Sequence, residues 1–329
     1  MTKKLKKDNL GQFLSKWASV IASVLLFVFF SAAMPATFPT LSNITSILRS
    51  VAITCVIGIG LTINMASGGF DLSVGMMASL ANALCMSFII WFGFGTLPAI
   101  LLAILVCEIF TIISFSVTVK FKVPEMLTTL SMQFVLSGIA TTYAGAASIS
   151  AVAKIWWSGE MPTASIPPFF TSLGKAPLII VVMMVCVIIV HIFLNYTKYG
   201  RYFYAVGDNR TAAKLSGLSV TKYRYLAKIM ACVFIALGGI LVGARTSSAT
   251  ISSASGQLMP AMAAVIVGRS VAGAGKPNAL GTLVGAFLIG MLENGLVMIG
   301  VPYYVMDAVK GVVLLIALAI AYVNGKEEG

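Results

Sequence analysis

Charge is scarce in this sequence of 329 residues. Charged side chains make up 10% of it and hydrophobic residues 59%, with a mean hydropathy of +1.00. A soluble protein has about a quarter of its residues charged, so the composition argues against an ordinary soluble enzyme. The long apolar runs instead predict an all-α, polytopic helix bundle in a bilayer, because each crossing needs about 20 apolar residues.

Metal ligands and ATP-binding motifs are also scarce. The chain has one histidine, and each of its five cysteines stands alone in an apolar run, which predicts buried hydrophobic side chains and no metal site. The segment 274–277, Ala-Gly-Lys-Pro, lacks the preceding glycine and the following Ser or Thr of a phosphate-binding loop. We therefore expect no cofactor, no metal and no ATP hydrolysis by the chain itself. A membrane-embedded enzyme would have no recognisable nucleophile here.

About ten apolar segments have the length of a membrane crossing. The segment at 257–273 is short and polar-edged, so it either spans or re-enters. The first segment follows the basic residues 1–16 and is longer than the apolar part of a signal peptide, which favours an uncleaved span. The predicted segments are 17–38, 51–67, 72–92, 97–119, 125–145, 177–196, 223–245, 257–273, 278–300 and 302–323.

The basic residues are distributed unevenly between the predicted loops. With 22 Lys and Arg against 10 Asp and Glu, the net charge is +12. Most loop cations fall in 1–16, 120–124, 197–222 and 274–277, whereas 39–50 and 146–176 carry few. By the positive-inside rule, both termini are predicted to be cytoplasmic. The sequence thus predicts a single transmembrane domain over 1–329, with 197–222 as a cytoplasmic loop.

A helix break is predicted at residues 68–75, Gly-Gly-Phe-Asp-Leu-Ser-Val-Gly. A carboxylate deep in a membrane costs roughly 2.5–3.5 kcal/mol on insertion scales, so Asp71 should face protein or water. Asp71 could cap the following helix by accepting from the amides near Ser73. Alternatively, the break lines a translocation path, with Asn64, Asp71 and Ser73 presenting hydrogen-bonding groups. The two interpretations are compatible.

A short cytoplasmic helix is predicted in the 197–222 loop. Asp208 or Asn209 can cap it, and Gly217 can end it. A helix this short is unstable alone, so it should be docked against something. It is either part of a basic connector or a helix that inserts into a groove on a cytoplasmic partner.

These motifs resemble those of bacterial ABC importer permeases of the ribose-type monosaccharide family, whose relatives import branched-chain amino acids. Residues 68–75 are similar to the family motif G-G-[hydrophobic]-D-L-S-V-G, and 200–218 to its cytoplasmic coupling segment. Further matches are Ala263–Gly268, Gly281-Thr282, Asn294-Gly295-Leu296 and Lys310-Gly311. Departures occur at Gln257, Pro260 and Arg269. The resemblance covers nearly the whole chain after residue 40.

The resemblance implies a permease of the bacterial cytoplasmic (inner) membrane that pairs with a second permease copy around a central path. It also implies a cytoplasmic ABC ATPase, an extracytoplasmic solute-binding protein and a monosaccharide substrate, with no nucleic acid. The expected substrate-path residues are Asn64, Gly68, Gly69, Phe70, Asp71, Ser73, Gln257 and Asn294. The expected ATPase-coupling residues are Asp208, Asn209, Arg210, Thr211, Ala212, Ala213, Leu215, Ser216 and Gly217.

A different class of transporter remains open at this point. In an ion-coupled secondary transporter of a small polar solute, Asp71 or Glu293 would be the coupling site. Such a protein would take up its solute without an ATPase partner, and Asp71→Asn would abolish its ion coupling.

Overall fold

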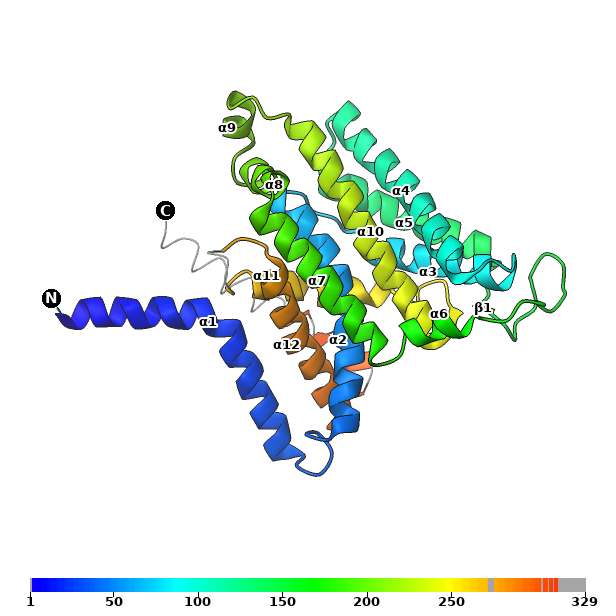
Figure 1. The fold of residues 1–329 in the computed structure, drawn as a ribbon, viewed down its shortest axis with the longest axis horizontal. Coiled ribbons are helices and arrows are strands. Elements are labelled where there is room, and N and C mark those ends of the chain that lie inside the picture. Colours follow the sequence, from blue (N-terminus) through cyan, green and yellow to red (C-terminus); the bar gives the residue numbers. More distant parts are fainter. Residues whose placement is uncertain (1, 272–274, 303, 307, 310, 313–329) are drawn as a thin grey trace.

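The described part of the chain consists of helices joined mostly by short connections, with a longer segment over 145–167 and one pair of two-residue strands (Figure 1). The computed structural model describes residues 2–271, 275–302, 304–306, 308–309 and 311–312, with side chains from Trp17 onward except Ala18. The elements in chain order are α1 (Thr2–Ala33), α2 (Leu41–Ala66), α3 (Val74–Ile90), α4 (Thr96–Phe121), α5 (Glu125–Ala144), β1 (Ile149–Ser150), α6 (Pro168–Leu173), α7 (Leu178–Tyr196), α8 (Lys198–Asp208), α9 (Arg210–Leu215), α10 (Val220–Thr246), β2 (Ser248–Ala249), η1 (Ser255–Gln257), α11 (Leu258–Gly268) and α12 (Ala279–Met298).

The predicted all-α membrane bundle is confirmed. Among the described residues, five helices are long and apolar enough to cross a bilayer, namely α2, α4, α7, α10 and α12. Three shorter apolar helical stretches are Ser19–Ala33, Val74–Ile90 and Ser255–Gly268. The five cysteines are buried and free, as the sequence predicts.

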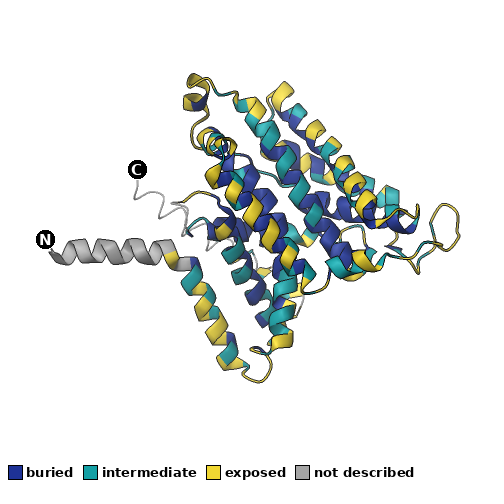
Figure 2. Ribbon diagram, in the orientation of Figure 1, coloured by how far each residue is buried: buried dark blue, intermediate teal, exposed yellow. Residues whose placement is uncertain are grey.

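Helices α2, α3 and α10 form the centre of the bundle. In α2 and α10, 67% of the most apolar stretch is buried, against 28% in α4, so α4 lies on the outside (Figure 2). Leu101, Leu105 and Ile109 repeat every four residues on the exposed face of α4, which suits contact with lipid. A methyl group on Gly239 of α10 would lie 1.9 Å from the carbonyl oxygen of Ala78 on α3. The centre is therefore closely packed backbone to backbone.

Two predicted boundaries near the N-terminus are wrong. The apolar run predicted a span over 17–38, but α1 ends at Ala33, two residues before Pro35, which fits the difficulty of continuing a helix into proline. Phe38 then folds back onto Phe30, with ring centroids 5.2 Å apart. The second span was predicted from residue 51, whereas α2 begins at Leu41, because the Thr40 hydroxyl caps it and Arg49 lies within it.

The predicted segment 257–273 contains a helix too short to cross a bilayer. α11 has 11 residues, about 16 Å of helix, against a hydrocarbon core of roughly 30 Å. Before it and the short η1, residues 250–254 run non-helically against α3, where the Ala254 amide donates to Ser79 Oγ over 3.0 Å and Asn82 donates to Ser253 Oγ over 2.8 Å. Such backbone is tolerated at membrane depth only where protein satisfies it. Most of the predicted segment 302–323 lies outside the described residues.

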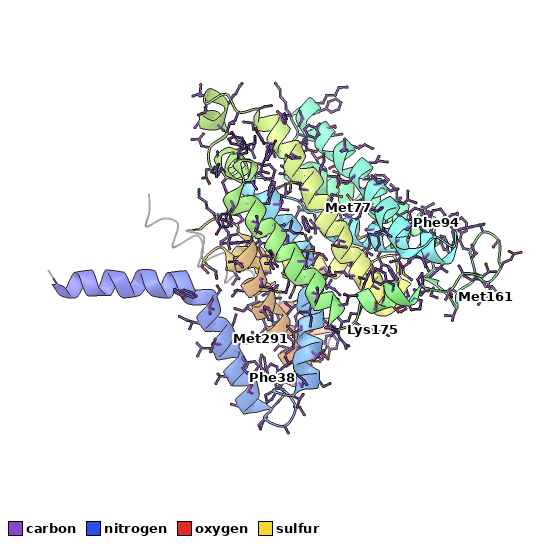
Figure 3. All side chains as sticks on the ribbon, in the orientation of Figure 1. Phe38, Met77, Phe94, Met161, Lys175 and Met291 are labelled. Atoms are coloured by element: carbon purple, nitrogen blue, oxygen red, sulfur yellow. The ribbon has the colours of Figure 1, made fainter. Side chains whose placement is uncertain are left out.

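The bundle has two distinct ends. At one, α8 and α9 lie beside the start of α10 (Figure 1), and we call it the α9 end. At the other, β1 pairs antiparallel with β2, and this is the β1 end. Figure 3 shows Phe94, Met161 and Lys175 gathered toward the β1 end. Trp156 and Trp157 are half exposed in the same loop as Met161.

Candidate functional site

The chain between α2 and α3 forms a sharp break whose backbone is held by α5. Gly68 has φ +72°, a conformation that glycine adopts without a steric penalty. The Phe70 amide donates to Glu125 Oε1 over 3.2 Å, and the Leu72 amide donates to Thr129 Oγ1 over 3.2 Å. The first two turns of α5 therefore supply the acceptors that the interrupted helix lacks.

Asp71 binds both the following helix and α10. Its Oδ1 accepts from the amide and the hydroxyl of Ser73, at 2.9 and 2.6 Å, which fixes the start of α3. Its Oδ2 lies 2.8 Å from Lys228 Nζ. Lys228 is only 4% exposed, so its ammonium needs carboxylate partners to remain charged.

Glu125 completes a buried cluster of four charges. Its Oε1 lies 2.8 Å from Lys228 Nζ, and its Oε2 pairs with Arg224, whose guanidinium lies 5.1 Å from the centre of the Phe115 ring. We call Asp71, Glu125, Arg224 and Lys228 the ion-pair cluster. Two negative and two positive charges sum to zero, which is the arrangement that makes burial of charge tolerable.

Three members of this cluster, Glu125, Arg224 and Lys228, were not predicted from the sequence. Lys228 falls inside the predicted span 223–245, and a lysine within a span requires a buried partner. Arg224 and Lys228 are four residues apart and so share one face of α10. Two cations at this spacing within a predicted span are the sequence signal for a buried acidic partner. Nothing local in the sequence identifies Glu125 as the residue that lies between them.

A small polar cavity adjoins the cluster. Three of its lining residues, Thr111, Ser114 and Thr118, repeat along one face of α4 and present hydroxyl groups. The remaining lining residues are Asp71, Ser73, Met77, Phe115, Glu125, Thr129 and Lys228. The cavity thus presents hydroxyls and paired charges to any water or solute that enters.

Asn64 lies directly against the break. The residue is 1% exposed, and its side-chain nitrogen and oxygen have no hydrogen-bond partner among the described residues. A methyl group on Gly69 would lie 2.2 Å from Asn64 Oδ1. Gly69 is therefore required for Asn64 to occupy this position.

Substituting Gly69 with alanine is expected to destabilise the break, because the new methyl group would overlap the Asn64 carboxamide. Overpacking of this kind typically costs about 1–3 kcal/mol. The midpoint of thermal unfolding of the detergent-purified protein measures the loss. In Gly69→Ala/Asn64→Ala the overlap with the carboxamide is removed, and much of the lost stability should return. A double variant no more stable than Gly69→Ala would contradict this account.

The other two predicted path residues lie elsewhere. Gln257 Oε1 accepts from Thr54 on α2 over 2.8 Å, and Thr54 is ten residues, or about 15 Å, from Asn64. Asn294 lies on α12, where the neighbouring Gly295 packs against Phe30. In Figure 3, the labels Met291 and Phe38 mark this part of α12 and the turn that follows α1. The predicted path residues in 64–73 therefore adjoin one another in the break, whereas Gln257 and Asn294 lie on other elements.

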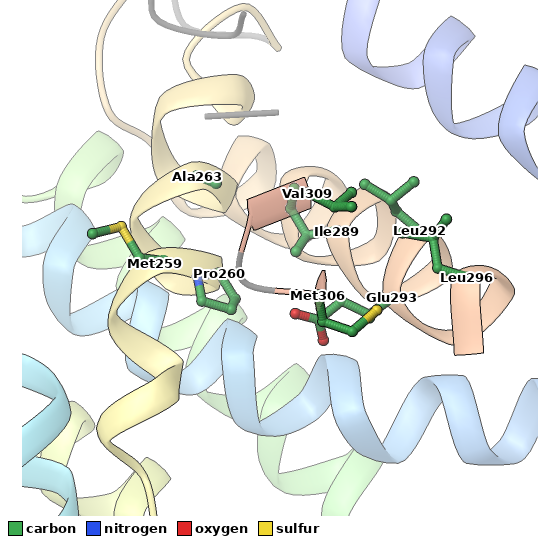
Figure 4. A pocket seen from close by; sticks show the side chains of 9 residues that line it. All are labelled: Met259, Pro260, Ala263, Ile289, Leu292, Glu293, Leu296, Met306 and Val309. Atoms are coloured by element: carbon green, nitrogen blue, oxygen red, sulfur yellow. The ribbon is translucent and has the colours of Figure 1, made fainter. Parts of the chain in front are cut away.

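A second, apolar pocket lies between α11, α12, Met306 and Val309 (Figure 4). Glu293 is the one ionisable residue among the described residues that line it. The other lining residues are Met259, Pro260, Ala263, Ile289, Leu292, Leu296, Met306 and Val309. This pocket offers a poor environment for a polar solute.

A short helix forms where the 197–222 loop predicts one. Of the two predicted caps, Asn209 is the one used: its Oδ1 accepts from the Ala212 amide over 3.0 Å. Gly217, with φ +81°, follows the end of α9. Ala213 faces inward and is 4% exposed, whereas Leu215 is 85% exposed. The outward face of α9 also carries Thr211, Ala212, Lys214 and Ser216.

Asp208 ties this loop to the start of α12 instead of capping α9. Its carboxylate pairs with Lys276, the lysine of the false phosphate-binding motif. Close by, the Tyr204 hydroxyl donates to the Pro277 carbonyl over 2.7 Å. Burial, with a smaller contribution from the Asp208 charge, raises the pKa of Tyr204 to about 12. Tyr204 therefore keeps its proton and remains a donor at physiological pH.

Comparisons with known proteins agree with this architecture. The family described as "Branched-chain amino acid transport system / permease component" matches residues 43–318. The ribose import permease RbsC of Haemophilus influenzae is 31% identical, over 97% of each chain. The ribose import permease of Escherichia coli K12 is 29% identical over 94% of each chain. The xylose transport system permease of H. influenzae is 26% identical over 98% of this chain and 99% of the relative.

No solved structure matches the chain. The family match covers well over half of the residues, and the relatives are matched along almost their whole length. The resemblance read from residues 68–75 and 200–218 is thereby confirmed. The chain belongs to the family of branched-chain amino acid transport system permease components, and it is similar to ribose import permeases over almost its whole length.

Proposed function

We propose that this chain is the membrane-spanning subunit of an ATP-driven ABC importer for a monosaccharide, such as ribose or another simple sugar. The observation that carries the proposal is α9: a capped helix that exposes Leu215, in a chain matched end to end by import permeases. Together with the family match, the 85% exposure of Leu215 outside the apolar spans makes this side chain available for contact with another protein.

The proposal places the α9 end in the cytoplasm, with about ten crossings and both termini inside. The basic loops support this orientation, since the described cations of 120–124, 197–222 and 274–277 flank spans that end or begin there. They are Lys120, Lys122, Lys198, Arg201, Arg210, Lys214, Lys222 and Lys276. In the bacterial cytoplasmic membrane, this end would meet the ATPase, and the β1 end would meet a solute-binding protein.

The outward face of α9 would rest in a groove on the ATPase. Thr211, Ala212, Leu215 and Ser216 are exposed and available for that contact. Asn209 and Gly217 hold the shape of the helix, and the inward Ala213 fixes it to its own chain. Closure of two ATPases around ATP would move the α9 helices of two permease copies, and the bundles would open to alternate sides.

A neutral, hydroxyl-rich substrate fits the polar groups near the break. Asn64 and Ser73 can exchange hydrogen bonds with hydroxyls, and so can the threonines and serines of the neighbouring cavity. Asp71 and Glu125 are already paired with Lys228, which leaves no uncompensated charge in the cluster for a zwitterionic amino acid. The relatives named for ribose and xylose support a monosaccharide.

An ion-coupled secondary transporter is the competing function. It requires a carboxylate that can exchange its cation or proton during the cycle. Asp71 is bound on both oxygens, by Ser73 and by Lys228, which fits a structural carboxylate better than an exchanging one. Glu293, the other candidate, lines a pocket that is otherwise apolar.

Affinity purification of the tagged chain from its native membranes tests the proposal. A P-loop ATPase and a solute-binding protein are expected to co-purify, and the reconstituted complex should import sugar only with ATP inside the liposomes. ATP-independent uptake by the chain alone, driven by a proton or sodium gradient, would leave the secondary transporter standing. Ligand screening on the captured binding protein then identifies the substrate.

A further inference from the structure

The first residue of α9 is bonded to the helix break. Arg210 Nη2 donates to the carbonyl oxygen of Gly68 over 2.7 Å, across 142 positions of sequence. Gly68 is the residue at which the chain leaves α2, with its positive φ. A charged donor on a carbonyl makes a stronger hydrogen bond than a neutral one. The loop assigned to ATPase docking therefore contacts the loop assigned to the translocation path.

A second contact joins the same two segments without any side chain. A methyl group on Gly207, in the last turn of α8, would lie 2.3 Å from the carbonyl oxygen of Ala66 and 3.0 Å from the amide nitrogen of Gly68. A methyl group on Gly68 would in turn lie 3.1 Å from Gly207 Cα. The two backbones are thus in direct contact, with no flexible side chain between them to absorb a displacement.

The break is in turn fixed to α5 and α10. The Phe70 amide bonds to Glu125, and Asp71 bonds to Lys228 on α10. Arg224 then links Glu125 back to α10, one turn before Lys228. From Arg210 to Arg224, every step is a hydrogen bond, an ion pair or the covalent chain between Gly68 and Asp71.

The loop is also tied to the segment before α12, by the Tyr204–Pro277 hydrogen bond and by an ion pair. Asp208 and Lys276, which join the loop to the start of α12, are each about half exposed. Exposed ion pairs contribute little and are screened by salt. Arg210 bonds α9 directly to the break, and α9 also packs against α10.

We propose that Arg210 and the Gly207–Gly68 contact transmit the movement of α9 to the helix break, and that the ion-pair cluster passes it on to α5 and α10. This inference rests on the proposed function, because it assigns the route by which ATPase movement reaches the path. Arg210 is a positioning residue here: it acts through Gly68 and touches no substrate.

The test compares Arg210→Met, Arg210→Lys and the control Arg201→Met in the reconstituted importer. Arg201 is an exposed cation on the neighbouring α8, so its loss removes the same charge nearby. We expect Arg210→Met to retain the ATPase partner and ATP hydrolysis while uptake falls about tenfold, a typical coupling effect. ATP hydrolysed per sugar imported would rise accordingly. Arg210→Lys, which keeps a charged donor, should recover most of the uptake, and Arg201→Met should behave like the wild type.

Hydrogen exchange supplies a second readout that a purely structural role would not change. In the wild type and Arg201→Met, a non-hydrolysable ATP analogue should alter amide exchange in peptides covering 64–74. In Arg210→Met that response should disappear.

An unchanged ratio of ATP to sugar, or an unchanged exchange response, would overturn the proposed connection. Loss of ATPase binding in Arg210→Met would also overturn it, and would place Arg210 in the docking face instead. If the wild-type chain captures no ATPase, the proposed function itself is wrong, and the proposed route from α9 to the helix break is wrong with it.

Discussion

Lys228→Met is expected to be the most damaging single substitution in the described part of the chain. It leaves Asp71 without its cation and Glu125 with Arg224 alone, so the ion-pair cluster carries a net charge of −1. Removing one partner of a buried ion pair costs about 3–5 kcal/mol. For a protein of this size, we expect the thermal midpoint in detergent to fall by roughly 10 °C. Sugar uptake should fall with it.

Charge balance provides the control for this prediction. In Asp71→Asn/Lys228→Met, Glu125 and Arg224 remain as a neutral pair, and the unpaired carboxylate is gone. The double variant should therefore be more stable than Lys228→Met, even though it carries one more substitution. Equal or greater destabilisation of the double variant would show that Lys228 acts through packing and not through its charge.

Leu215→Asp is expected to separate the permease from its ATPase while leaving the membrane bundle intact. The side chain is 85% exposed, so the substitution removes no internal packing. At the centre of an interface, losing an apolar anchor costs about 2 kcal/mol or more, which is roughly a 30-fold loss of affinity. Burying a carboxylate in the same groove adds a desolvation penalty. Co-purification of the ATPase and ATP-driven uptake should both decline.

Val152→Asp is the matched control for Leu215→Asp. Val152 is 84% exposed, but it lies next to β1, at the opposite end of the bundle. The same change there should leave ATPase co-purification at the wild-type level. An undiminished ATPase yield with Leu215→Asp would contradict the docking role of α9. Ala213→Asp is unsuitable for this test, because Ala213 is buried within its own chain.

Several features could be predicted because their causes are local. Long apolar runs specify membrane helices wherever they occur, so α4, α7 and α12 lie within three residues of their predicted bounds. Asn209 and Gly217 set the limits of α9 through a side-chain cap and a left-handed residue. The paired glycines before Asp71 predicted the break for the same reason.

Other features depend on residues far apart in the sequence. The end of α1 at Ala33 departed from the predicted span over 17–38, because hydropathy does not register where a chain folds back. The short α11 fits the re-entrant alternative that the sequence left open for 257–273. Gln257 and Asn294 were grouped with Asp71 by motif, but Gln257 bonds to Thr54 and Asn294 lies on α12 beside Gly295.

The sequence by itself determined that this protein is a helical membrane protein with a broken segment and a capped loop helix, since those properties follow from composition and nearest neighbours. Only the tertiary structure decided that Lys228 joins Asp71 to Glu125, and that Arg210 reaches Gly68. The physical reason is that a buried charge fixes only that some partner must exist. Which residue serves is decided by the packing of α2, α5, α8 and α10 against one another.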